Sequence, residues 1–216
     1  MGIFGLPVQL WPVWILVVLM SMTIHEWAHN YVGWRMGDPV PRQDGKLTLN
    51  PLAHIYWFGF IMFVVVGFGV LGTANISPYR MKKEGRRWRW LAAIAAGPVS
   101  NLILAVIAAL IFRLAPDDVL RVGSIGTFLT LLITFNVLLF VFNLLPLYPI
   151  DGWQIVLSLL PAELAGWWQR NQMNTYYILI GLILFGFVAA NTSLPNPLAI
   201  IIGQPAGAIA RFLYGF

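Results

Sequence analysis

The sequence predicts an all-α polytopic membrane protein. Two features of its composition indicate this class: 59% of the 216 residues are hydrophobic, and only 10% are charged. A soluble domain carries about 25% charged residues, so most of this chain is expected to lie in lipid. A third feature is the grouping of apolar residues into runs close to the roughly 20 residues that a helix needs to cross a bilayer.

Five of these runs predict transmembrane helices. Little sequence is left over for soluble modules, so we expect one domain over residues 1–216, with its core at about 8–152 and C-terminal helices at 153–216. The tryptophans fall largely near the ends of the runs, as in an interfacial belt. The runs lie at about 8–31, 91–112, 125–145, 176–190 and 197–213.

Basic residues predict the orientation, because Lys and Arg collect on the cytoplasmic side of a membrane. Arg35 and the basic cluster at 80–89 should both be cytoplasmic, so the apolar run between them, 55–71, should enter and leave on one side. Its glycines and β-branched residues favour a re-entrant hairpin or loop that neighbouring protein shields. The alternative is a plain transmembrane helix, for which about 17 apolar residues just suffice. With the hairpin, the last two spans return the C-terminus to the cytoplasm.

A glutamate between two histidines lies inside the first apolar run. His25, Glu26 and His29 form an H-E-x-x-H pattern. Residues i and i+4 share one face of a helix, so both imidazoles can reach one metal ion. Glu26 lies about 100° from His25 around the helix, close enough to act on a water at that metal. The chain has no cysteine, so the other ligands must be histidine, carboxylate, amide or water.

Asp151 is the second carboxylate in strongly apolar sequence; the other six of the eight acidic residues lie in polar loops or at segment ends. An ionisable residue at membrane depth is costly unless it is paired or bound to metal. Pro146 and Pro149 must break the helix before it. Asp151 can therefore be the third ligand of a site within the bundle, toward the cytoplasmic side, with a fourth position for water. The amide of Asn143, near the same end of its span, can hydrogen-bond an oxyanion or a substrate backbone.

Together these motifs resemble the site-2 protease family of intramembrane zinc metalloproteases, in the compact prokaryotic form without PDZ or nucleotide-sensing domains. The matching segments lie in chain order at 25–29, 49–55, 97–101 and 143–152. The chain departs from the family at Tyr56, where relatives often have Asp.

The resemblance implies one Zn²⁺ ion held by His25, His29 and Asp151, with Glu26 and Asn143 as catalytic residues. It implies regulated intramembrane proteolysis, in which a peptide bond in or near a transmembrane segment of a membrane-protein substrate is hydrolysed. It also implies a multi-pass protein of the prokaryotic cytoplasmic membrane.

Two further polar residues are candidates for substrate binding. His54 lies beside a loop at the membrane surface, where it is either a structural histidine or part of the active-site entrance. Asn101 follows Gly97 and Pro98, and the alternative role for this segment is close packing and hydrogen bonding between helices.

Two other functions fit parts of the pattern. A membrane zinc carrier or zinc-stabilised scaffold would not need Glu26, and a carrier favours ligands at several depths. A metalloprotease of the prenyl-protein-processing type shares H-E-x-x-H but uses a glutamate as third ligand, whereas Glu163 here follows Pro161 in a polar turn. The net charge of +5 could suggest binding to nucleic acid, but the positions of the basic residues indicate a cytoplasmic membrane face instead. The expected partners are therefore the bilayer and a transmembrane substrate, with the oligomeric state open.

Overall fold

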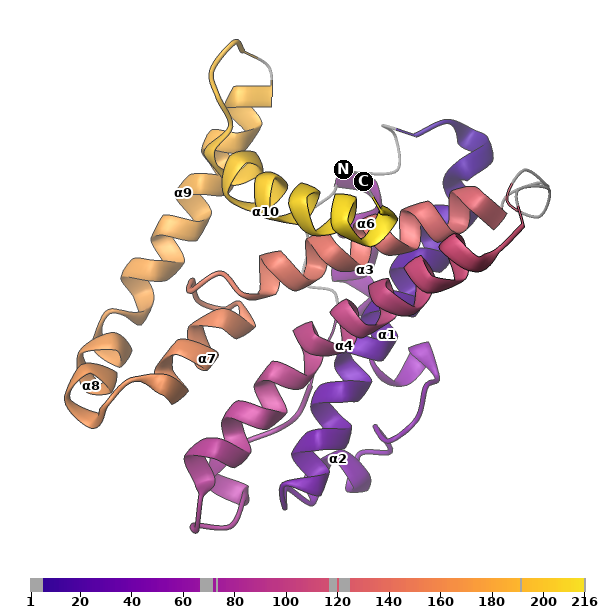
Figure 1. Ribbon diagram of the computed structural model, residues 1–216. Coiled ribbons are helices and arrows are strands. Elements are labelled where there is room, and N and C mark those ends of the chain that lie inside the picture. The colour runs from indigo at the N-terminus through magenta and orange to yellow at the C-terminus, as the bar shows by residue number, and fades with distance from the viewer. Residues whose placement is uncertain are drawn as a thin grey trace.

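The computed structural model describes residues 6–66, 72, 74–116, 120, 125–190 and 192–215 (Figure 1). Within these ranges the regular structure is helical, apart from one isolated antiparallel bridge between Ile55 and Gly72. Five helices are long and apolar enough to cross a membrane, which confirms the predicted class. They are α1 (Trp11–Arg35), α4 (Arg86–Leu114), α6 (Ile125–Asn143), α9 (Gln172–Ala190) and α10 (Pro197–Tyr214).

Shorter helices connect these five. Three are single turns of 3-10 helix that begin at or next to a proline. The short helices are η2 (Val8–Leu10), α2 (Val40–Gln43), η3 (Pro51–Ala53), α3 (Trp57–Val66), η4 (Pro78–Arg80), α7 (Asp151–Leu159) and α8 (Ala162–Arg170). In Figure 1, α7 and α8 lead from the end of α6 to α9, which stands apart from the first three long helices.

Helices α1, α4 and α6 pack together and form the core. Val17 and Val18 of α1 meet Ala105 and Ala108 of α4 and Ile133 of α6 in one buried apolar cluster. Between helices in lipid, close packing replaces the hydrophobic effect as the main attraction, and small residues let the backbones approach. The alanines of α4 therefore allow α1, α4 and α6 to pack closely, and the candidate site lies further along α1.

The segment predicted as a re-entrant hairpin contains a short helix. Helix α3 has 10 residues, about 15 Å, and is too short for a hydrocarbon core of about 30 Å. Ile55 pairs with Gly72, so the chain returns to its starting point after α3. This pairing contradicts a plain spanning helix over 55–71, whose ends would lie about 24 Å apart. Residues 67–71 lie outside the described part of the chain.

The predicted course of the C-terminus is wrong. Arg113 lies in the last turn of α4, at the opposite end from the basic cluster that precedes this helix, and its Nη2 donates to the Phe212 carbonyl at 2.7 Å. The Tyr214 hydroxyl is 3.1 Å from the Thr130 carbonyl in the first part of α6. Helix α10 therefore ends at the side away from the basic cluster. The apolar run predicted the presence of this helix, but hydropathy does not tell on which side of the membrane the helix ends.

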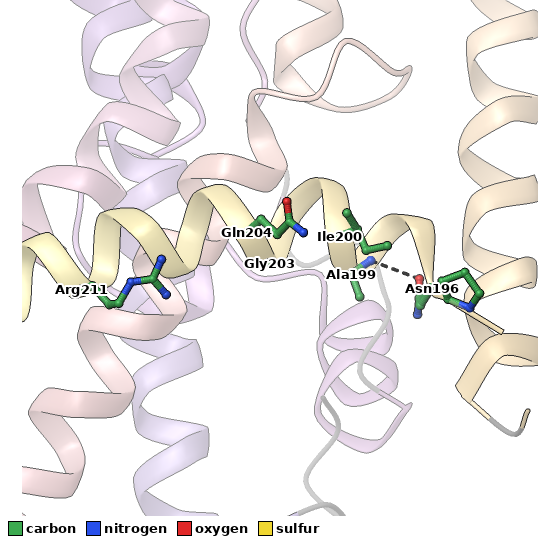
Figure 2. Close-up of a pocket in the computed structure, with 7 residues that line it drawn as sticks. Asn196, Ala199, Ile200, Gly203, Gln204 and Arg211 are labelled. Carbon is green, nitrogen blue, oxygen red and sulfur yellow. Dashed lines mark hydrogen bonds between the residues drawn. The ribbon is translucent and has the colours of Figure 1, made fainter. Parts of the chain in front are cut away.

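Local sequence explains where α10 begins and ends. The Asn196 side chain accepts a hydrogen bond from the Ala199 N–H, drawn as the dashed line in Figure 2, and Pro197 opens the helix. Gly215 ends it in a left-handed conformation with φ of 96°. An open hollow of about 700 Å³ runs along this helix (Figure 2). It is lined by α10 and the turn before it, and none of the predicted site residues lines it.

Candidate metal centre

The H-E-x-x-H residues are buried in the second half of α1. His25, Glu26 and His29 each expose 6% or less of their surface. The two imidazoles lie on one face, as their spacing predicts, with their Nε2 atoms 3.1 Å apart. Two titratable rings and a carboxylate are thus buried in a helix that is long and apolar enough to cross a membrane.

Asp151 reaches the same point from a different element, because it is the first residue of α7. Its Oδ2 lies 3.2 Å from His25 Nε2 and 3.2 Å from His29 Nε2. The turn between α6 and α7 is tight, and a Cβ on Gly152 would lie 2.3 Å from the Leu145 carbonyl oxygen. Glycine at 152 therefore lets α7 begin close enough to α6 to present Asp151 to both histidines.

The spacing of the three ligand atoms fits one tetrahedral zinc ion. Zinc bonds of about 2.0–2.1 Å place neighbouring ligand atoms about 3.3 Å apart. The observed separations of 3.1, 3.2 and 3.2 Å are close to this value. Among the described residues, His25, His29 and Asp151 are the group of histidines and acids able to hold a metal.

The hydrogen bonds behind the histidines direct their lone pairs to the same point. His29 Nδ1 lies 2.9 Å from the Ala93 carbonyl oxygen, and His25 Nδ1 lies 2.6 Å from Asn101 Oδ1. Since these oxygens only accept, both Nδ1 atoms carry the hydrogen and both Nε2 atoms are free acceptors. Three acceptors that face one another at hydrogen-bond distance repel unless a cation lies between them. This donor set is therefore suited to a metal ion.

The backbone of α4 at Gly97, which has no side chain, packs directly against both histidine rings. A Cβ there would lie 2.2 Å from His29 Nε2 and 2.8 Å from His25 Cε1. We expect Gly97→Ala to lower zinc affinity about tenfold or more, because the added methyl displaces both rings from the ligand position. Alanine is the better helix former by about 1 kcal/mol, so a weakened helix cannot explain the loss.

Zinc titration against a chelator measures this effect in purified protein. Gly181→Ala is the matched control, since this glycine also lies inside a long helix but has nothing within 4 Å of the added methyl. Equal zinc affinities for the two variants would contradict the role given to Gly97.

Glu26 lies against the segment that returns from α3. A Cβ on Gly72 would lie 2.3 Å from both Cγ and Oε1 of Glu26, so only glycine fits beside this carboxylate. Gly72 is also the residue that pairs with Ile55. Glu26 therefore lies beside the residue at which the chain after α3 pairs with the chain before it.

Comparison with known proteins now decides the family. The chain is 36% identical over 184 residues to the protein named "Putative zinc metalloprotease YwhC" of Bacillus subtilis, which covers 83% of this chain and 82% of that protein. The chain belongs to the site-2 protease family. It is 33% identical over 147 residues to "Putative zinc metalloprotease Rip2" of Mycolicibacterium smegmatis, covering 65% of this chain and 56% of that protein. Neither a protein-family model nor a solved structure matches the chain.

Of the remaining candidate residues of this site-2 protease, Asn101 contacts a ligand. Asn143 is the last residue of α6 and uses one amide hydrogen on the Leu139 carbonyl, which leaves the second hydrogen for another acceptor. Asn101 has no exposed surface and holds His25, so it contacts the ligand rather than a substrate. His54 is buried, with Nε2 2.6 Å from the Thr48 carbonyl oxygen and no partner for Nδ1 in the described part of the chain.

Asp38, one of the acidic residues expected in polar loops, is buried. Its carboxylate has no exposed surface and accepts hydrogen bonds from Arg80 Nε at 2.8 Å, Ser77 N at 2.8 Å and Val40 N at 3.1 Å. These bonds tie the loop after α1 to the segment that follows Gly72. The bond to the Val40 N–H is an Asx turn, an arrangement typical of Asp, whereas the bonds from Arg80 and Ser77 join residues that are far apart in the sequence.

The hydrogen bonds of Asp38 predict a pH-dependent contribution to stability. Burial alone would raise the pKa of Asp38, but the hydrogen bonds from Arg80, Val40 and Ser77 outweigh burial and hold the pKa below its usual value. A lowered folded-state pKa stabilises the fold above the unfolded value of about 3.9, and this contribution disappears as the pH falls through the folded-state pKa.

We expect Asp38→Asn to lower the free energy of unfolding by about 1–3 kcal/mol at pH 7, because the buried donors lose a charged acceptor. The difference from wild type should shrink as the pH falls below about 4, because the carboxylate of the unfolded chain then binds a proton that the folded wild-type carboxylate does not yet bind. Thermal unfolding in detergent at several pH values measures both effects. A difference that stays constant down to pH 3 would contradict this assignment.

Proposed function

We propose that the chain is a zinc-dependent intramembrane endopeptidase that hydrolyses a peptide bond in or near a transmembrane segment of a membrane protein. The observation that carries this proposal is the convergence of His25, His29 and Asp151 within 3.2 Å, with Glu26 next to His25 on the same helix. Helix α1, which supplies His25, Glu26 and His29, is apolar enough to span a membrane, and so is α6, which leads to Asp151. A transmembrane helix of a substrate can therefore lie beside the site without leaving the lipid.

The three ligands and Glu26 have different roles in hydrolysis. Zn²⁺ held by His25, His29 and Asp151 would lower the pKa of water toward about 7 and polarise the scissile carbonyl. Glu26 accepts the proton of the attacking water and later donates it to the leaving amine. The free amide hydrogen of Asn143 stabilises the developing oxyanion. The substrate helix must unwind locally, because a helical carbonyl is already hydrogen-bonded, so helix-destabilising residues near the cut favour cleavage.

The site lies toward the cytoplasmic side of the membrane in this proposal. His29 contacts Ala93, which follows Arg86 by seven residues or about 10 Å along α4. The basic residues at the start of α4 mark the cytoplasmic end of that helix. The source of the relatives named above, Bacillus subtilis and Mycolicibacterium smegmatis, supports the proposal that this membrane is the cytoplasmic membrane of a prokaryote.

The alternatives have less support. A zinc carrier needs ligands at several depths, whereas His25, His29 and Asp151 are one cluster and no second one is found in the described residues. A zinc-stabilised scaffold does not need the buried Glu26. Glu163, the third ligand expected for the prenyl-protein-processing type, is exposed on α8 and is absent from the cluster.

Removal and return of the metal test the proposal. We expect purified protein in liposomes to cleave a model transmembrane substrate with a helix-destabilising Gly-Pro segment, to lose activity with a zinc chelator, and to recover it when Zn²⁺ is added in excess. Chelator already saturated with zinc is the control. Cleavage that continues after the protein has been shown to be zinc-free would overturn the assignment.

A further inference from the structure

Three buried polar residues lie behind His25, one on each helix of the core. Ser21 of α1, Asn101 of α4 and Asn136 of α6 have no exposed surface. A buried amide without partners costs free energy, so polar side chains inside a bundle need complete hydrogen bonding. These residues satisfy one another and have no contact with the hollow along α10.

Backbone carbonyls determine which atom donates in each hydrogen bond of Asn136 and Ser21, because a carbonyl can only accept. Asn136 Nδ2 donates to the Leu132 carbonyl at 2.8 Å and to Ser21 Oγ at 2.8 Å. The Ser21 hydroxyl donates to the Val17 carbonyl at 2.7 Å, so its oxygen accepts from Asn136. Because a carbonyl only accepts, the nitrogen of the Asn136 amide must face Leu132, and its oxygen must face the other way.

This direction passes on to His25. Asn136 Oδ1 accepts from Asn101 Nδ2 at 2.8 Å, and the same Nδ2 lies 3.3 Å from the Ser21 carbonyl. With its nitrogen directed to these two acceptors, Asn101 presents Oδ1 to His25 Nδ1 at 2.6 Å. His25 Nδ1 must then carry the hydrogen, and its Nε2 lone pair faces His29 and Asp151.

We propose that Asn136 and Ser21 are positioning residues of the metal centre, which fix the Asn101 amide and thereby hold His25 in the tautomer that binds metal. This inference rests on the proposed zinc site. It assigns the choice of tautomer to α6, the helix that also leads to Asp151. This chain of hydrogen bonds from Ser21 and Asn136 through Asn101 to His25, the relay, makes metal binding depend on the correct packing of α1, α4 and α6.

Zinc affinity tests the relay. Loss of an outer partner of a metal ligand typically costs 10–100-fold in affinity. We expect Asn136→Leu, which keeps the branched heavy-atom shape and removes the side-chain bonds to Leu132, Ser21 and Asn101, to weaken Zn²⁺ binding about tenfold. Ser21→Ala should weaken it less, since it removes one acceptor, and Ser21→Thr should restore wild-type affinity because it returns the hydroxyl.

Thr23→Val is the matched control. Thr23 is also buried in α1, and its hydroxyl donates to the Leu19 carbonyl of the same helix, with no bond to another helix in the described part of the chain. We expect this variant to lose stability without losing zinc affinity. The measurements are chelator competition with Zn²⁺, thermal unfolding without metal, and ¹⁵N NMR of the histidine rings in metal-free protein, which reports the tautomer of His25.

The outcomes separate the relay from the proposed function. Weaker Zn²⁺ binding and a mixed His25 tautomer in Asn136→Leu, with both unchanged in Thr23→Val, would support the relay. Wild-type affinity in folded Asn136→Leu would overturn the relay and leave the metal site intact. Should Asn136→Leu not fold, equal affinities of Ser21→Ala and Ser21→Thr overturn it instead. A wild-type protein that binds no Zn²⁺ would overturn the proposed function and the relay with it.

Discussion

Glu26→Gln is expected to lower the rate of peptide-bond hydrolysis at least about 10³-fold while zinc binding and folding stay unchanged. Glutamine has the shape of glutamate but cannot accept the proton of the attacking water, and a positioned general base typically contributes 10²- to 10⁴-fold. The shape must be kept because Gly72 lies directly against this side chain. The measurement is the initial rate of cleavage of a model transmembrane substrate in liposomes, together with the zinc content of each preparation.

The control for this variant is Glu163→Gln. Glu163 is an exposed carboxylate on α8 and no part of the metal centre, so its loss should leave the rate unchanged. A Glu26→Gln protein that still cleaves at the wild-type rate would show that Glu26 is not the base. Loss of zinc as well as activity would instead assign Glu26 a role in holding the metal.

Asp151→Ala is expected to lose zinc. Its Oδ2 is the acceptor that faces both histidines at 3.2 Å, and it is the charged ligand of the three. Its removal leaves two imidazoles as protein ligands. Loss of a residue that only hydrogen-bonds a metal ligand lowers metal affinity by up to about 100-fold, and we expect the loss of a ligand itself to cost more. Zinc content after dialysis and affinity by chelator competition measure the loss.

Glu163→Ala distinguishes the two kinds of membrane metalloprotease. We expect this variant to keep its zinc, since Glu163 is exposed and outside the cluster. Zinc retained by Asp151→Ala and lost by Glu163→Ala would reverse the assignment and indicate the prenyl-protein-processing type.

The sequence predicted the part of the site that depends on local spacing and on the cost of charge in lipid. His25 and His29 share a helical face because they are four residues apart, and Asp151 stood out as a carboxylate in apolar sequence. The structure brings these three together. Asn136 is an amide inside a predicted span, the same kind of signal as Asn101 and Asn143, but no motif marks it in the sequence, so it was not predicted.

Features that depend on tertiary contacts were less predictable. The buried state of Asp38 depends on Arg80 and Ser77, about 40 residues away, and no local pattern reports that distance. The pairing of Ile55 with Gly72 agrees with the expected return of 55–71 to one side, but the helix α3 inside it was not predicted. Helix α10 ends beside Arg113, so the orientation rule for basic residues, with the last two runs counted as full crossings, predicted the wrong side for the C-terminus.

The most direct test of intramembrane proteolysis is to identify the fragments that this protein releases. Membranes containing wild-type protein or Glu26→Gln are compared by mass spectrometry of the soluble and membrane fractions. The account predicts fragments present only with wild type, whose new ends lie in or near transmembrane segments toward the cytoplasmic side. New ends confined to soluble domains, or the same fragments with Glu26→Gln, would contradict it.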